Sequence, residues 1–176
     1  MLTREKLVSE EWTAIRNTPH LVMLAVSGAG GSTLDSMLER HAGLKGIVEA
    51  MHSTHPLLRQ IADAPQILEA QESVRSWIYT LPDEERTPAR IQERALESMR
   101  EALVALATKG KPDDVSLYQE FVLSTAMRVA RAAREGDFLG IDGVRVSAGE
   151  SQFIEKLRTL SGGKPTGFKL AIGHPW

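Results

Sequence analysis

The chain has 176 residues, of which 42% are hydrophobic and 25% are charged, as is usual for one globular domain with its own core. It contains no cysteine, which excludes disulfides, thiolate metal sites and cysteine catalysis. The net charge of −2 argues against a nucleic-acid partner, because phosphate binding favours a basic excess. The longest apolar run, Leu21 to Val26, is far shorter than the ~20 residues of a membrane span. With no visible secretory signal, we expect a cytoplasmic protein without a membrane partner.

The first third of the chain predicts three helical segments. Ser9, followed by two glutamates, is typical of an N-cap and predicts a short helix to about Arg16. Thr18 and Pro19 then predict a new helix start, followed by an apolar run that we expect to be buried on most sides. Ser32 would cap the next helix. Its expected buried stripe comprises Leu34, Met37, Leu38, His41, Lys45, Val48 and His52, widened by Leu44 and Met51.

The remainder of the chain also reads as helices. Prolines bracket a short helix at 57–63, and a longer one follows at about 66–80. Thr87 and Pro88 predict the start of a helix that ends at Gly110. Its expected buried stripe is Ile91, Ala95, Met99, Ala102, Leu103 and Leu106. Asp113 or Asp114 would cap a long amphipathic helix to about residue 135, and a last helix spans roughly 149–160. The sequence therefore predicts an all-α, compact bundle of about seven or eight helices in a single domain, residues 1–161.

Residues 162–176 have a different pattern and predict an extended tail. Phe168, Leu170 and Ile172 alternate with Lys169 and Ala171, which is the period of an extended segment with one buried face. Large apolar side chains are a poor choice for a freely solvated end. We therefore expect the tail to pack on its own bundle or on a neighbouring copy, and the second arrangement would make a homodimer.

Two groups of residues are candidate ligand sites. Gly30, Gly31 and Ser32 lead into a helix N-terminus, where free amides could hold an anion, although the lysine of a phosphate loop is missing and a plain turn is the alternative. Glu49 and His52 form one Glu-x-x-His motif of the kind that binds metals in helical bundles, with His55 and Asp142 as further candidate ligands. A second copy of the motif is missing, so packed histidines are the alternative.

The chain contains no complete catalytic motif, and no cofactor is required by the sequence. The first hypothesis is therefore a non-enzymatic module that binds another protein or assembles with itself. One alternative is a metal protein or enzyme that uses Glu49, His52 and His55. The other is a small-molecule binder with a pocket between helices.

Two stretches share one plan: a helix, a glycine-containing turn, a serine cap and a second helix. They could be two pseudo-repeated helical hairpins. In the second stretch, Asp142-Gly143 is followed by Ser147 and Glu150, which have the spacing of a capping box. This motif resembles that of TerB-like tellurite-resistance domains, which are all-helical bacterial domains of about this size. The resemblance implies a stress- or signalling-linked helical domain and does not imply an enzyme.

Overall fold

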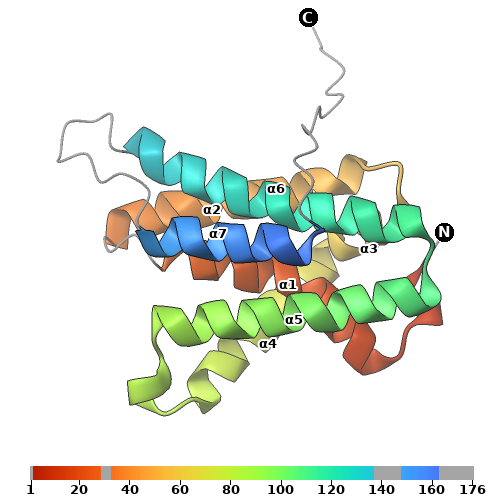
Figure 1. Cartoon of the computed structure of the whole chain (residues 1–176), viewed down its shortest axis with the longest axis horizontal. Helices are drawn as coiled ribbons and strands as arrows, with labels where there is room; N and C mark the ends of the chain where they lie inside the picture. The colour runs from red at the N-terminus through yellow and green to blue at the C-terminus, as the bar shows by residue number, and fades with distance from the viewer. Residues whose placement is uncertain (1, 29–32, 137–147, 163–176) are drawn as a thin grey trace, which may run out of the picture.

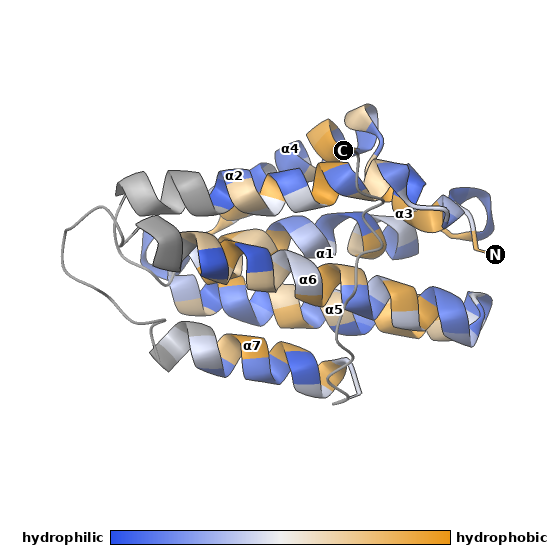
Figure 2. Cartoon of the chain, turned by 90° about the horizontal axis from the view of Figure 1, so that it is seen from above, coloured by the Kyte–Doolittle hydropathy of each residue, from blue (hydrophilic) through white to orange (hydrophobic). Residues whose placement is uncertain are grey.

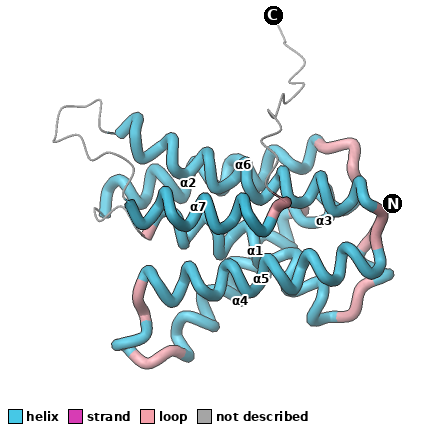
Figure 3. The backbone as a smooth tube through the Cα atoms, viewed as in Figure 1, coloured by secondary structure: helices cyan, strands magenta, loops and turns pink. Residues whose placement is uncertain are grey.

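Seven α-helices form the part of the chain that the computed structural model describes, residues 2–28, 33–136 and 148–162, excluding the side chains of 33–39, 133–136, 148 and 150. The helices are α1 (Ser9–Ser27), α2 (Thr33–Glu49), α3 (Pro56–Ile61), α4 (Ala64–Thr80), α5 (Pro88–Lys109), α6 (Pro112–Gly136) and α7 (Ala148–Leu160). Three short 3-10 helices, η1 (Arg4–Lys6), η2 (Ala50–His52) and η3 (Asp83–Glu85), lie in the connections. These residues contain no strand (Figure 3), so the predicted all-α bundle is confirmed.

Helix α1 lies at the centre of the bundle and packs against α2, α4, α5, α6 and α7 (Figure 1). Helices α1 and α2 run antiparallel, and so do α6 and α7, so that each pair forms a helical hairpin. The outer helices carry mixed hydrophobic and hydrophilic residues along their length (Figure 2), as expected of helices with one buried and one solvated face. None of the helices in the described residues is long and apolar enough to cross a membrane.

The predicted break between Arg16 and Thr18 is wrong, because α1 continues without interruption to Ser27 with Pro19 inside it. The helix also begins one residue earlier than predicted, since Val8 rather than Ser9 is the N-cap residue and Ser9 is already helical. The side chain of Glu11 accepts a hydrogen bond from the Val8 amide at 2.9 Å, which fixes this end.

A contact with α6 explains how α1 tolerates the proline. Pro19 has no N–H, so the carbonyl of Ile15, four residues earlier, loses its helical donor. The hydroxyl of Tyr118 donates to this carbonyl at 2.8 Å, and the Tyr118 side chain is fully buried. A side chain about one hundred residues away thus satisfies the acceptor that the proline leaves free, and α1 remains one helix.

The predicted buried stripe of α2 is also wrong at most of the side chains that the structure describes, although Leu44 packs against the core. His41, Lys45, Val48 and His52 are exposed, whereas Gly43 and Ile47 are buried. A Cβ atom at position 43 would lie 2.6 Å from Met23 Cγ and 2.7 Å from Val129 Cγ2, so only glycine fits between α1 and α6. Close backbone packing, rather than the width of an apolar stripe, decides which face of α2 is buried.

Helix α5 matches its prediction closely. The hydroxyl of Thr87 accepts a hydrogen bond from the Arg90 amide at 3.2 Å, so the N-cap is confirmed. The members of the predicted stripe are buried or partly buried: Ile91, Ala95, Met99, Ala102, Leu103 and Leu106. Local capping and helical periodicity together determine this element.

Candidate functional site

The structure separates the candidate metal ligands of the described residues. Glu49 is half-buried and forms an ion pair with Arg128 of α6 at 2.7 Å, while His52 is exposed at the end of η2. His55 is buried and pairs with Asp114. In the described ranges, no three His, Cys, Asp or Glu side chains come together in a way that could hold a metal ion. Asp142 lies outside these ranges, so the metal hypothesis stays a prediction.

The other candidate residues fall at the edges of what the structure describes. Gly30, Gly31, Ser32 and Ser147 lie outside the described residues, as does the tail beyond Gly162. Glu150 belongs to the first turn of α7, but its side chain is outside the description. The anion site and the capping box therefore stay predictions.

The His55–Asp114 pair is buried and connects three segments of the chain by hydrogen bonds. His55 Nε2 and Asp114 Oδ1 are 2.7 Å apart, and the Asp114 carboxylate also accepts from the amides of Lys111 at 2.7 Å and Leu2 at 3.4 Å. Burial raises the pKa of Asp114, but these hydrogen bonds outweigh it and lower the pKa below its usual value. The pair is enclosed by the protein and ties the first residues and the start of α3 to the start of α6.

His20 is a second buried histidine, in the middle of α1. Neither ring nitrogen has a hydrogen-bond partner among the described residues, and the side chain is inaccessible to solvent there. Burial, with a smaller contribution from the positive charge of Arg16, lowers the pKa of His20 to about 4. His20 is therefore a neutral core residue near pH 7.

A wide groove with a volume of about 820 Å³ lies between α5 and α7. We call it the α5–α7 groove. The buried side chains of Leu96 and Phe153 form its apolar floor, and charged and polar side chains form its walls. The full lining is Glu84, Glu85, Thr87, Ala89, Arg90, Gln92, Glu93, Leu96, Glu97, Arg100, Phe153 and Lys156.

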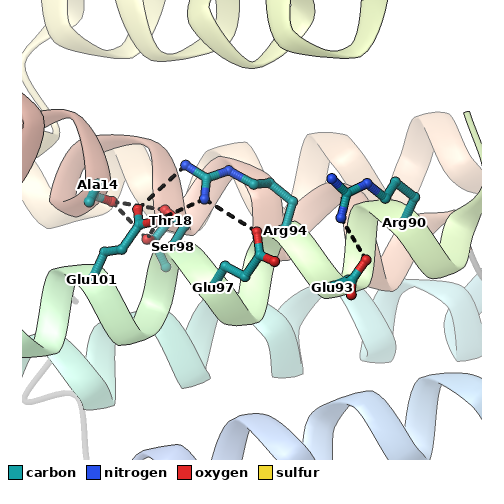
Figure 4. A network of polar contacts seen from close by, with 8 residues as sticks. All are labelled: Ala14, Thr18, Arg90, Glu93, Arg94, Glu97, Ser98 and Glu101. Atoms are coloured by element: carbon teal, nitrogen blue, oxygen red, sulfur yellow. Dashed lines mark hydrogen bonds and ion pairs between the residues drawn. The ribbon is translucent and has the colours of Figure 1, made fainter. Parts of the chain in front are cut away.

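The charges of the groove are arranged by sign along its length. Arg90 is neutralised by Glu93 at 2.6 Å (Figure 4). Glu84 and Glu85, before the start of α5, make no ion pair in the described part of the chain, and neither do Arg100 and Lys156. Because α5 and α7 run in the same direction (Figure 1), the unpaired acids lie at one end of the groove and the unpaired cations lie further along it. The groove thus has acids without an ion pair near the start of α5 and cations without one further along, over an apolar floor.

The sequence alone did not identify this groove. Arg90 and Glu93 are three residues apart on α5, a spacing that is typical of an ion pair on the solvated face of any helix and does not mark a groove. The acidic run Asp83-Glu84-Glu85, just before a capped helix, is the signal that could have marked one end. Nothing in the sequence indicated that Lys156 and Phe153 would face α5, because that depends on how α7 packs.

Comparisons with known proteins do not assign the chain to a family: no family model, no curated protein and no solved structure matches it.

Proposed function

We propose that the protein is a non-enzymatic binding and assembly module, and that the α5–α7 groove is its binding surface. The observation that carries this proposal is the order of the groove's unpaired charges, acids at one end and cations at the other. Such an arrangement selects the direction of an extended ligand, because reversing the ligand places like charges together. The buried histidines do not offer an alternative site, since both are enclosed.

The occupant that we propose is the tail, residues 163–176, of a second copy of the chain. Its alternating Phe168, Leu170 and Ile172 suit an apolar floor, and Lys164 and Lys169 suit the acids of the walls. Fourteen extended residues reach roughly 46–50 Å, which is ample for the length of the groove.

The direction of the groove favours the second copy over the same chain. Because α7 runs toward the cationic end, a tail that folds back from Gly162 enters beside Arg100 and Lys156, where Lys164 is repelled. A tail from a second copy can enter at the opposite end, beside Glu84 and Glu85, where Lys164 is attracted. The resulting assembly is a homodimer formed by exchange of identical segments.

A charge-swap experiment tests this function. The double variants Glu84→Lys/Glu85→Lys and Lys164→Glu/Lys169→Glu should each weaken self-association, and the combination of all four substitutions should restore it. Sedimentation equilibrium measures the dissociation constant. Glu155→Lys, on the exposed surface of α7 outside the groove, is the matched control and should change little.

Truncation after Gly163 separates the two sources of the tail. If the tail is an assembly arm, truncation halves the particle mass to near that of one chain and leaves the melting temperature of the monomer unchanged. A full-length chain that is monomeric, and whose melting temperature falls on truncation, would show that the tail docks on its own bundle and would overturn the proposed dimer. If mass and melting temperature are both unchanged, the tail does not dock and the proposed function fails.

A further inference from the structure

A second cavity lies between the segment around η1, the first turns of α1 and the start of α4. Its volume is about 400 Å³, within the roughly 300–1,000 Å³ of small-molecule sites. Arg16 is the most buried of its charged lining residues, and we call it the Arg16 cavity. It shares no lining residue with the α5–α7 groove.

The guanidinium of Arg16 is fixed in place but is not saturated. Its side chain is only 4% exposed, Nη1 lies 2.6 Å from Glu69 Oε1, and Nε donates to Asn17 Oδ1 at 3.1 Å. Asn17 in turn donates to Ser73 Oγ at 2.8 Å, which holds the arrangement against α4. In the described part of the chain, Nη2 of Arg16 has no acceptor. A buried guanidinium with free N–H groups at a cavity is a donor that an anion can complete.

The counter-ion of Arg16 is the part of this pair that can move. The Glu69 side chain is 55% exposed, so water screens it and replaces its contacts at little cost. The hydrogen bond from Arg16 lowers the pKa of Glu69, so Glu69 is charged at neutral pH. The Glu69 carboxylate therefore binds Nη1 of Arg16 and would compete with the carboxylate of a ligand for the guanidinium.

Trp12, one turn before Arg16 on α1, and Leu7 supply the apolar part of the cavity lining. Trp12 is buried, and its indole Nε1 donates to Gln66 Oε1 at 3.0 Å, which locks the ring. The Arg4 guanidinium lies 5.6 Å from the centre of the Trp12 ring, in cation–π geometry. A ligand in the cavity therefore meets a charged donor with an apolar surface beside it.

We propose that the Arg16 cavity binds a small monocarboxylate with an apolar body. The carboxylate would accept from Nη2 of Arg16 and, by displacing Glu69, from Nη1, which gives the forked geometry that a guanidinium favours, and the apolar body would lie against Trp12 and Leu7. Glu5 and Glu69 also line the cavity and place negative charge at its rim. Arg4 and Arg16 balance these two acids, so a ligand with one negative charge fits the lining better than inorganic phosphate or a dicarboxylate, whose second charge would lie near Glu5 or Glu69.

The fluorescence of Trp12 provides a local measurement of binding. The chain has three tryptophans, so Trp77→Phe/Trp176→Phe leaves Trp12 as the one reporter. Titration with hexanoate should give a saturable change, and titration with 1-hexanol or inorganic phosphate should not. Arg16→Gln in this background should weaken hexanoate binding at least tenfold. An unsaturable response, or an equal response to 1-hexanol, overturns the proposal.

Glu69→Gln keeps the test valid even if the Arg16 variant does not fold. Removal of the competing carboxylate should strengthen hexanoate binding by roughly threefold or more, a gain that a loss of structure cannot produce. Glu72→Gln, on an exposed part of α4 outside the cavity, is the matched control and should leave the affinity unchanged. If Glu69→Gln does not strengthen binding, Arg16 is not the anchor and the proposal is wrong.

Discussion

Helix α1 and the outward face of α5 both carry many polar side chains, but those of α1 are buried and those of α5 are exposed to water. On α1, the side chains of Arg16, Asn17, Thr18 and His20 are all less than a tenth exposed. On α5, Arg94 forms ion pairs with Glu97 at 3.5 Å and with Glu101 at 3.1 Å, and the side chains of both acids are accessible to water. Figure 4 shows the two settings side by side, because Ser98 of the same helix reaches inward to Thr18 and Ala14.

The difference between the two regions is the cost of losing a partner. A buried donor or acceptor without its partner has no water to replace it, and the penalty is about 1–3 kcal/mol. An exposed ion pair exchanges one set of contacts for another with solvent and is worth about 0–1 kcal/mol. We therefore expect changes around α1 to alter the free energy of unfolding strongly, and changes on the outward face of α5 to alter it little.

The largest expected effect concerns the protonation of His20. Its pKa is about 4 in the folded protein, lower than in the unfolded chain, so the unfolded state binds the proton first as the pH falls. The free energy of unfolding should therefore have its full value above about pH 6.5 and should be lower by about 3 kcal/mol at pH 4. Urea unfolding at several pH values measures this loss.

A matched pair of leucine variants isolates the contribution of His20. His20→Leu should flatten the pH dependence in this window, whereas His41→Leu, at an exposed position of α2, should leave it in place. An unchanged pH dependence in His20→Leu would show that other groups cause the acid sensitivity.

The next effect concerns the close approach of α2 to α1 and α6. Gly43→Ala places a methyl group against Met23 and Val129, and we expect a loss of about 1–3 kcal/mol from overpacking. Gly46→Ala is the control, because its new Cβ meets mainly the flexible end of Arg128 at 2.8 Å. In thermal or urea unfolding, Gly43→Ala should lose clearly more unfolding free energy than Gly46→Ala. Equal losses would contradict the proposed packing of α2.

A smaller effect is expected from the hydroxyl that compensates for Pro19. Tyr118→Phe leaves the Ile15 carbonyl without a donor, at a cost of about 1–2 kcal/mol. In a Pro19→Ala background the cost should shrink, since the new N–H of residue 19 supplies the helical hydrogen bond. A double-mutant cycle measures this coupling by urea unfolding. A cost of Tyr118→Phe that is the same in both backgrounds would refute the explanation.

The smallest effect is expected on the outward face of α5. Arg94→Ala should change the free energy of unfolding by about 0.5 kcal/mol or less, and added salt should reduce even that difference. Ser98→Ala, one turn away on the same helix, should cost about 1 kcal/mol because its hydroxyl bonds Thr18 and the Ala14 carbonyl in the core. If Arg94→Ala proves the more damaging of the two, the comparison of the two regions fails.

Local features of the sequence were sufficient to predict the class of fold and several of its helices. The N-cap at Thr87, the proline at position 88 and the apolar period of α5 act within one or two turns, and the structure has them as predicted. The all-α bundle follows from many such local signals that agree with one another. By contrast, the metal candidates were grouped by their closeness in sequence, and the structure gives Glu49 and His55 partners on α6 instead.

Tertiary packing decided the rest, because the deciding contacts join residues far apart in the chain. Pro19 predicts a helix break by itself, whereas in the continuous α1 the hydroxyl of Tyr118 satisfies the carbonyl that the proline leaves without a donor. Gly43 has no side chain to contribute to an apolar stripe, yet it is buried because two helices meet there. The α5–α7 groove and the Arg16 cavity arise in the same way: helix packing brings together side chains from separate segments, and hydrophobic periodicity does not encode which segments meet.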